Sequence, residues 1–502
     1  MDTLEARVSY EFFKQLLLLL LLMAPLPPSS SEFTVVMPDS SALVDAPQTG
    51  FSDSARTDPA EQRAVYEIME ATGNGWATSI PDVCRGRWHG IECMPDTNDV
   101  YHVVSLSFGA LSDDTAFPTC DPARSSLSPA LLALPHLRSL FFYRCFTGSP
   151  QPVPAFLGRL GPTLRSLVLR ENANTGPIPA ELGNLTSLRV LDLHGNHLSS
   201  SVPPSLQLLR NLQLLDLSHN QLYGPVPELN LPSLTVMDLS RNLLHGRIPT
   251  SFGRWDSLVK MDLSRNRFSG SIPDSLCDLQ NLVLLDLSHN RLAGPLPRSL
   301  GGLRSLTALI LTGNPMSSAM IPKDAFAGLA ALNTLILSNM GLQGSIPESI
   351  GELGSLRVLH LDGNKLNGSI PKSFQKLQKL TELRVNDNQL MGPIPIGREM
   401  LWKMGKKLRL YNNSGLCYDM SYGRYEGIES MSGISYCETE SKDAASARSH
   451  TTKHYLSSTS RDGGHGRPSS LSSSGAARKL HLAQEELVDL IAPLLVSLLV
   501  FL

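Results

Sequence analysis

Apolar residues recur at a fixed spacing through the middle of this 502-residue chain. The frame L-x-x-L-x-L-x-x-N appears nine times, and its last residues are 22 or 24 positions apart except for one interval of 50. A tenth copy fills that interval and carries Met340 in the asparagine position. In each copy the L-x-L core predicts a short strand whose leucines point to one side while the residue between them points to the other. The nine asparagines are Asn172, Asn196, Asn220, Asn242, Asn266, Asn290, Asn314, Asn364 and Asn388.

The copies are expected to stack, because one copy cannot cover its own apolar face. The asparagine side chain can satisfy backbone groups where the chain turns away from the strand. A Gly-x-apolar-Pro phrase follows, as in GPIP at 176–179 and GSIP at 270–273; its glycine permits unusual φ and its proline ends hydrogen-bond donation. Weaker copies extend the array, so that it spans residues 101–413 in about 12 or 13 units.

The 24-residue length and the L-x-G-x-I-P phrase resemble plant-type leucine-rich repeats. The resemblance implies an α/β horseshoe, a leucine-rich-repeat solenoid with a parallel β-sheet on its concave face and disulfide-capped ends. It also implies a further short strand in each repeat and a plant origin.

The segment before the array predicts a helix that begins at Asp58. Asp58 is an acidic N-cap, Pro59 takes the first helical position, and Glu61 is expected to reach back to the cap. Residues 58–100 resemble the N-terminal cap of plant leucine-rich-repeat receptors. In that cap two cysteines pair, which implies a disulfide between Cys84 and Cys93.

The remaining five cysteines predict two more disulfides and one thiol. Cys417 and Cys437 bracket the predicted C-terminal cap at 414–437 and form the natural second pair. A bridge between Cys120 and Cys145 would staple the irregular first repeats, where regular stacking lapses. Cys277 lies in an outer segment where an apolar residue is expected, and is predicted to be a buried free thiol.

The sequences at both ends of the chain predict segments for export or membrane anchoring rather than parts of the folded array. Residues 1–30, with an apolar run from Leu16 to Met23, have the layout of a secretory signal peptide, and 31–57 are a flexible segment. Residues 438–486 form a Ser-rich polar stalk, predicted to be disordered. The apolar tail at 487–502 predicts a membrane anchor outside the cell, either a GPI-attachment signal or a short single-pass helix.

The composition and motifs of the chain argue against several classes of function. Lys and Arg total 43 against 46 Asp and Glu, a net charge of −3, which argues against a nucleic-acid binder. The chain has no H-E-x-x-H, P-loop or nucleophile-elbow motif, so neither an enzyme nor a cofactor is expected. A metal site in the N-terminal cap is not expected either, because His89 stands alone between its cysteines. Three sequons, at Asn184, Asn367 and Asn412, are candidate glycosylation sites.

The residue between the two leucines of each strand forms a candidate binding surface. One interpretation is that L-D-L-S is simply the consensus of this repeat class. The other is a graded concave face, acidic in the middle, then apolar, then basic, which suits a cationic peptide or a partner domain. In order the positions are Val168, Asp192, Asp216, Asp238, Asp262, Asp286, Ile310, Ile336, His360, Arg384 and Arg409.

A more specific resemblance is carried by the strand FFYRCF, the insert QPVPAFLGRLGPTL and the ending NNSGLC. Over residues 58–437 the chain resembles plant leucine-rich-repeat receptor-like proteins of stomatal patterning. The resemblance implies a membrane-anchored, kinase-less co-receptor that joins ERECTA-family receptor kinase ectodomains. Together they would perceive secreted cysteine-rich epidermal patterning peptides and control the division and spacing of the stomatal lineage. The alternatives are a defence-related receptor-like protein, a cell-wall-enzyme inhibitor, or an adhesion scaffold.

Overall fold

The computed structural model describes residues 56–86, 89–109, 118–316, 320–413, 415–419 and 434–437. The predicted signal peptide, the stalk and the apolar tail lie outside these residues. Within the part that is described, no helix combines the length and apolarity needed to cross a bilayer.

The N-terminal cap is built on the predicted helix, α2 (Pro59–Ala71). The Asp58 carboxylate accepts hydrogen bonds from the backbone N–H groups of Ala60 and Glu61, as an N-cap should. The expectation that Glu61 reaches back to this cap is wrong. Its side chain is buried and its two oxygens contact His102 and the backbone of Val103.

Short elements complete the cap beside this helix. Strand β1 (Arg56–Thr57) pairs in parallel with β3 (Val100–Phe108), and β2 (Ile91–Pro95) pairs antiparallel with β3 on a hairpin. A 3₁₀ helix, η1 (Gly75–Ser79), lies in sequence between α2 and β2.

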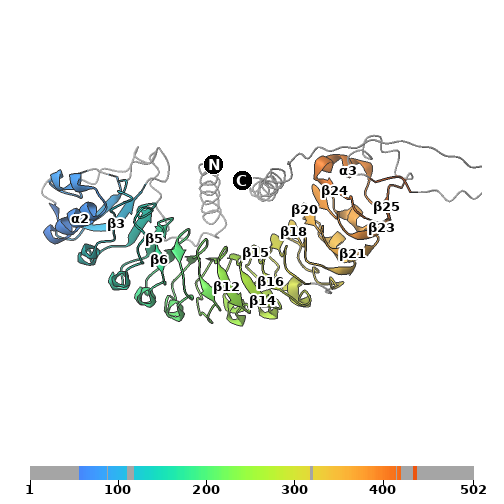
Figure 1. The fold of residues 1–502 in the computed structure, drawn as a ribbon, viewed down its shortest axis with the longest axis horizontal. Helices are drawn as coiled ribbons and strands as arrows, with labels where there is room; N and C mark the ends of the chain where they lie inside the picture. Colours follow the sequence, from blue (N-terminus) through green and yellow to red (C-terminus); the bar gives the residue numbers. More distant parts are fainter. Residues whose placement is uncertain are drawn as a thin grey trace, which may run out of the picture. The chain divides into compact units, whose positions relative to one another are not determined.

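The main sheet of the described chain has 15 strands and is parallel except for β2. Each repeat adds one strand beside the last, and the leucines of the L-x-L core are fully buried behind it. The repeats follow one another along an arc with this sheet on its inner side (Figure 1). After β3 its strands are β4 (Ser139–Tyr143), β5 (Ser166–Arg170), β7 (Val190–Asp192), β9 (Leu214–Asp216), β11 (Val236–Asp238), β13 (Lys260–Asp262), β15 (Leu284–Asp286), β17 (Ala308–Ile310), β18 (Thr334–Ile336), β20 (Val358–His360), β22 (Glu382–Arg384) and β24 (Leu408–Arg409).

A second set of short parallel strands confirms the extra strand per repeat that the resemblance implied. The glycine of each Gly-x-apolar-Pro phrase lies in or next to these strands with a positive φ, as at Gly224 (φ +90°) and Gly246 (φ +89°). The strands are β6 (Thr175–Gly176) with β8 (His197–Leu198), then β10 (Tyr223–Gly224), β12 (Leu243–Gly246), β14 (Arg267–Gly270) and β16 (Arg291–Leu292), and finally β19 (Gln343–Ser345), β21 (Lys365–Gly368), β23 (Gln389–Pro393) and β25 (Gly415–Cys417).

The outer side of most repeats is one turn of 3₁₀ helix, which begins directly after the proline of the phrase. The repeat that ends at Asn242 is two residues shorter, and its outer segment at 225–235 contains no helix. The last outer segment instead forms α3 (Arg398–Met404) and η11 (Gly405–Lys407). The other turns are η2 (Pro129–Ala133), η3 (Ala155–Arg159), η4 (Ala180–Asn184), η5 (Pro204–Leu208), η6 (Thr250–Arg254), η7 (Asp274–Asp278), η8 (Arg298–Gly302), η9 (Glu348–Glu352) and η10 (Lys372–Lys376).

The repeat asparagines form a buried ladder that joins each repeat to the one before it. Asn242 shows the pattern: its Nδ2 donates to the carbonyl of Leu217 at 2.9 Å and to that of Leu239 at 3.2 Å. Its Oδ1 accepts from the backbone N–H of Leu222 at 3.0 Å. One side chain therefore satisfies backbone groups of two successive repeats. Met340 replaces this amide with a buried apolar side chain, and Asn364 Oδ1 of the next repeat accepts from the backbone N–H groups of Met340 and Leu342.

Disulfides lie at both ends of the array. The bonds are Cys84–Cys93, Cys120–Cys145 and Cys417–Cys437, the three pairs that the sequence suggested. Cys277 is the free cysteine, and it is buried in η7 against the core. The bridges lie where the repeat pattern fades, whereas the leucine core and the asparagine ladder hold the regular middle.

The ladder predicts a large cost for removing one buried amide. Asn242→Ala leaves several buried backbone groups without a partner, and we expect the free energy of unfolding to fall by about 3 kcal/mol. Asn211→Ala is the matched control, since exposed Asn211 donates only one hydrogen bond, to the carbonyl of Thr186, and should cost about 1 kcal/mol or less. Chemical denaturation measures both. Equal losses in the two variants would contradict a structural role for the ladder.

Candidate binding surface on the concave sheet

The residues predicted to form the binding surface lie in one row across the main sheet, which we call the central row. Strand register places each directly beside the next, as in the pairing of Asp192 with Asp216 and of Asp216 with Asp238. The row continues through Asp262, Asp286, Ile310, Ile336, His360, Arg384 and Arg409.

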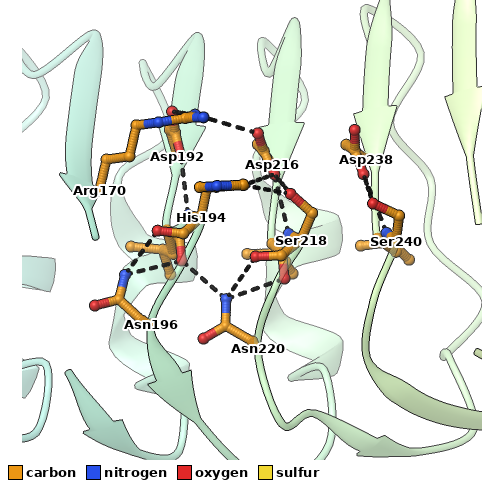
Figure 2. Close-up of polar contacts among 12 residues, drawn as sticks. Arg170, Asp192, His194, Asn196, Asp216, Ser218, Asn220, Asp238 and Ser240 are labelled. Atoms are coloured by element: carbon orange, nitrogen blue, oxygen red, sulfur yellow. Dashed lines mark hydrogen bonds and ion pairs between the residues drawn. The ribbon is translucent and has the colours of Figure 1, made fainter. Parts of the chain in front are cut away.

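The aspartates of the central row do not face solvent freely, which corrects the expectation from the sequence. Asp192 and Asp216 are buried, and the next three are half-buried. The physical reason is that each carboxylate folds back on its own chain. Oδ1 of Asp192 accepts from the backbone N–H of His194 at 2.9 Å, and Asp216 and Asp238 bond the N–H two residues later in the same way (Figure 2). The same bond recurs at Asp262 and Asp286.

Several of these carboxylates also hold a cation of the same face. The Arg170 guanidinium bonds Asp192 Oδ2 at 3.1 Å and lies 3.6 Å from Asp216 Oδ2 (Figure 2). Lys260 Nζ bonds Asp238 Oδ2 at 3.0 Å. Arg170 and Lys260 lie outside the single column considered from the sequence. The acidic middle of the row is therefore partly neutralised by neighbours that the sequence analysis missed.

The neighbouring aspartates titrate in opposite directions. Burial raises the pKa of Asp262 well above its ordinary value, and the adjacent Asp238 and Asp286 raise it further. Burial also acts on Asp238, but Lys260 and a hydrogen bond from Ser240 outweigh it and hold that pKa below its ordinary value. Asp238, which is paired with Lys260, therefore favours its charged form, whereas Asp262 beside it is shifted toward its neutral form.

Two histidines on this face are held neutral. Burial, followed by the charge of Arg170, lowers the pKa of His194 to about 4. Burial, followed by His194 and Arg241, lowers the pKa of His219 to about 4. Their rings lie 4.8 Å apart, and His194 Nδ1 is 2.7 Å from Ser218 Oγ. Near neutral pH neither ring adds charge to the surface.

The C-terminal part of the row is also paired internally. Ile310 and Ile336 are buried rather than offered as an apolar anchor. His360 Nε2 and Arg384 NH2 both contact Glu382 Oε1 at 2.8 Å, and all three side chains are buried. The predicted basic end therefore contains a buried cluster in which His360 and Arg384 share the Glu382 carboxylate.

The exposed charge beside the central row comes from a different position of the repeat. Arg241 and Arg265 immediately precede the ladder asparagines and are exposed at a φ of +52°. His219 and His289 occupy the same position in the flanking repeats, but their lowered pKa values leave them uncharged near neutral pH. We call Arg241 and Arg265 the basic flank. The R-N pairs that close the repeat frame are the signal that could have identified it.

The three predicted glycosylation sites are all exposed. Asn184 ends η4 on the outer side, Asn367 lies on β21 in the second set of strands, and Asn412 follows β24. None of the three belongs to the repeats that carry Arg241 and Arg265.

A group that could hold a metal ion lies outside the concave sheet. In the described part of the chain, Glu61, His102 and His136 of the N-terminal region bring one ligand atom each within 4.8 Å of the others.

The comparisons with known proteins agree with this architecture. The family model described as "Leucine rich repeat" matches residues 162–222, 232–292 and 331–390. The fold prediction is therefore confirmed: the chain folds as a leucine-rich-repeat solenoid.

Among curated proteins, the chain is 64% identical over 187 residues to "Protein TOO MANY MOUTHS" of Arabidopsis thaliana. That segment is 36% of this chain and 37% of the relative, so the match spans about a third of the relative's length. The resemblance found in the sequence is thereby confirmed over that segment.

Two solved structures share the fold. The PEPR1–AtPEP1 complex superposes with a TM-score of 0.55 at 27% identity, covering 72% of this chain and 52% of that one. The ectodomain of the Arabidopsis thaliana receptor kinase GASSHO1/SCHENGEN3, in complex with CASPARIAN STRIP INTEGRITY FACTOR 2, gives a TM-score of 0.54 at 27% identity, covering 71% and 47%. These similarities support a plant leucine-rich-repeat protein of the receptor-like type.

The pKa values of Asp262 and Asp238 shift in opposite directions, so replacing each with asparagine should change the free energy of unfolding in opposite directions. A raised pKa means that the folded state binds the proton more tightly than the unfolded state, so ionised Asp262 opposes folding at neutral pH. Asp262→Asn should therefore raise the free energy of unfolding at pH 7, on the order of 1 kcal/mol. The gain should shrink as pH falls toward the ordinary pKa of aspartate.

Asp238→Asn is the matched comparison. Its lowered pKa means that the charged form favours folding, so this variant should lose stability at pH 7, and the loss should shrink as acid protonates the wild-type carboxyl. Denaturant titrations across pH measure both. Changes of the same sign at pH 7 would contradict this assignment.

Proposed function

We propose that this protein is a kinase-less cell-surface co-receptor that joins ERECTA-family receptor kinases and modulates their response to secreted cysteine-rich patterning peptides. The output would be control of division and spacing in the stomatal lineage. The observation that carries the proposal is the 64% identity to TOO MANY MOUTHS over 187 residues. The proposal extends this similarity to the whole chain.

The architecture is compatible with a binding role. The in-register sheet and the buried asparagine ladder hold the central row and the basic flank on a rigid surface. A binding surface of this kind acts on a signalling partner through differential affinity, by favouring one of its conformations or one of its ligands. The two solved structures with similar folds, PEPR1–AtPEP1 and GASSHO1/SCHENGEN3, are complexes with peptide ligands, which supports a peptide or receptor ectodomain as the partner class.

The charges of the face refine which contacts we propose. From the repeat positions, the aspartates were expected to attract a cationic partner, but their oxygens already bind the chain's own N–H groups and cations. Arg241 and Arg265 are exposed beside them. We therefore assign the partner contact to the basic flank, facing carboxylates of the receptor kinase ectodomain. Opposite charges at the rim of an interface mainly raise the association rate.

The location follows from the same resemblance. Similarity to receptor ectodomains supports a place at the cell surface or outside the cell. Membrane attachment through residues 487–502, export through residues 1–30, and glycans at Asn184, Asn367 and Asn412 remain parts of the proposal.

The decisive experiment is co-purification of the tagged full chain with ERECTA-family ectodomains, with and without candidate patterning peptides. The proposal expects a stable complex whose amount changes with the peptide present. Failure to recover any complex under both conditions would overturn it. Binding to a cell-wall hydrolase instead would favour the inhibitor alternative.

A pair of charge reversals tests the surface. We expect Arg241→Glu combined with Arg265→Glu to weaken the complex at least 10-fold, because both side chains are exposed in the middle repeats. Arg210→Glu combined with Arg304→Glu is the matched control, since these exposed arginines lie on the outer side after η5 and η8. Surface plasmon resonance measures both pairs. Unchanged affinity of the first pair, or an equal loss in the control, would remove the basic flank from the interface.

A further inference from the structure

Three chain segments converge beside the N-terminal cap and bring two histidines to a buried carboxylate. Glu61 comes from α2, His102 from β3, and His136 from the loop between η2 and β4. One potential ligand atom from each lies within 4.8 Å of the other two. The cluster is separate from the concave sheet, and nothing in the proposed function uses it.

Glu61 is held as a ligand would be. Its side chain is only 3% exposed, and a buried carboxylate needs a partner for each oxygen. Oε2 accepts from the backbone N–H of Val103 at 2.7 Å, which fixes the orientation of the group. Oε1 is turned to His102 Nδ1, also at 2.7 Å. One oxygen is thus anchored to the sheet while the other faces the histidines.

His102 has a second carboxylate behind it. Its Nε2 lies 3.8 Å from Asp96 Oδ2, on the side away from Glu61. Asp96 is itself fixed, because its Oδ1 accepts from the backbone N–H groups of Asn98 and Val100 in the β2–β3 turn. A histidine that binds a metal through one nitrogen commonly donates the other N–H to a carboxylate, which fixes the tautomer and strengthens the ligand.

His136 completes the group from the solvent side. Its ring centroid is 4.1 Å from that of His102, with the planes tilted by 41°. The residue is exposed, so its side chain can adjust its position and leaves a path by which an ion can enter.

We propose that Glu61, His102 and His136 bind one Zn²⁺ ion, with water in the fourth position. Two imidazoles and one carboxylate suit zinc, whereas Ca²⁺ and Mg²⁺ prefer sites made of oxygen alone. Tetrahedral zinc bonds of about 2.0–2.2 Å place the ligand atoms roughly 3.3 Å apart. Glu61 Oε1 and His102 Nδ1, now 2.7 Å apart, must therefore exchange their hydrogen bond for bonds to the ion and separate slightly, while exposed His136 moves toward them. The bound ion links α2, the β2–β3 hairpin and the start of the first full repeat, and so fixes the cap on the array.

The test is a zinc titration of the purified full chain after treatment with a chelator, followed by calorimetry and by thermal unfolding. We expect one tight site per chain and a rise in Tm on binding. His136→Gln should weaken this site at least 10-fold while leaving the Tm in chelator unchanged, since the side chain is exposed. Asp96→Asn keeps the turn acceptor and should weaken zinc binding by roughly 10-fold through His102.

His197→Gln is the matched control, because His197 is an exposed histidine on β8, within the array. It should bind zinc like the wild type. Co²⁺ in place of Zn²⁺ gives a second readout, since a tetrahedral site with nitrogen ligands produces visible absorption that His136→Gln should abolish. Absence of a tight zinc site in the wild type, or wild-type zinc affinity in His136→Gln, would overturn the proposal.

Discussion

The structure depends on one requirement: every repeat must satisfy the backbone groups that it buries at its turn. A strand, a turn and a second strand within 24 residues leave N–H and carbonyl groups facing the core, where water cannot reach them. The ladder asparagines meet this need across the boundary between repeats, as Asn242 does for Leu217 and Leu222. Neighbouring repeats therefore stabilise one another, and the register of the sheet follows from the bonds that join them.

The same requirement shapes the inner surface. The aspartate of L-D-L-S binds the N–H two residues later, so a residue that looks like free surface charge is part of the turn. Lys260 and Arg170 then pair with the remaining oxygens. The residue before each asparagine has a positive φ in these repeats, and Arg241 and Arg265 are exposed there. Under the proposed function, this exposed position meets the partner, while the aspartates serve the turn.

Much of the fold could be predicted from the sequence, because the repeat is encoded in local spacing. The L-x-L cores predicted the strands, and the repeated asparagines predicted hydrogen bonds to the backbone at the turns. The helix begins after Asp58, as its N-cap pattern predicted. The details that depend on distant neighbours could not be predicted. Glu61 follows the capping-box pattern, yet its side chain accepts from the buried backbone N–H of Val103, 42 residues away. The local pattern around Asp58 contains no sign of so distant a partner.

The spacing predicted which residues lie in one row, but not which of their charges are paired. Register places Asp192 to Arg409 in one row, as the spacing required. A single column of letters does not reveal Lys260 beside Asp238, or Glu382 between His360 and Arg384. Those pairings depend on neighbouring strands that only the folded sheet brings together, and they decide how much of the charge of the row is neutralised.

The central claim is that the aspartates of the central row are structural and that the basic flank makes the contact. A structure of this protein in complex with a receptor kinase ectodomain tests it most directly. The account predicts carboxylates of the partner beside Arg241 and Arg265, with Asp192 still bonded to Arg170 and Asp238 to Lys260. Partner lysines or arginines bonded to those aspartates, with the basic flank left in solvent, would contradict it.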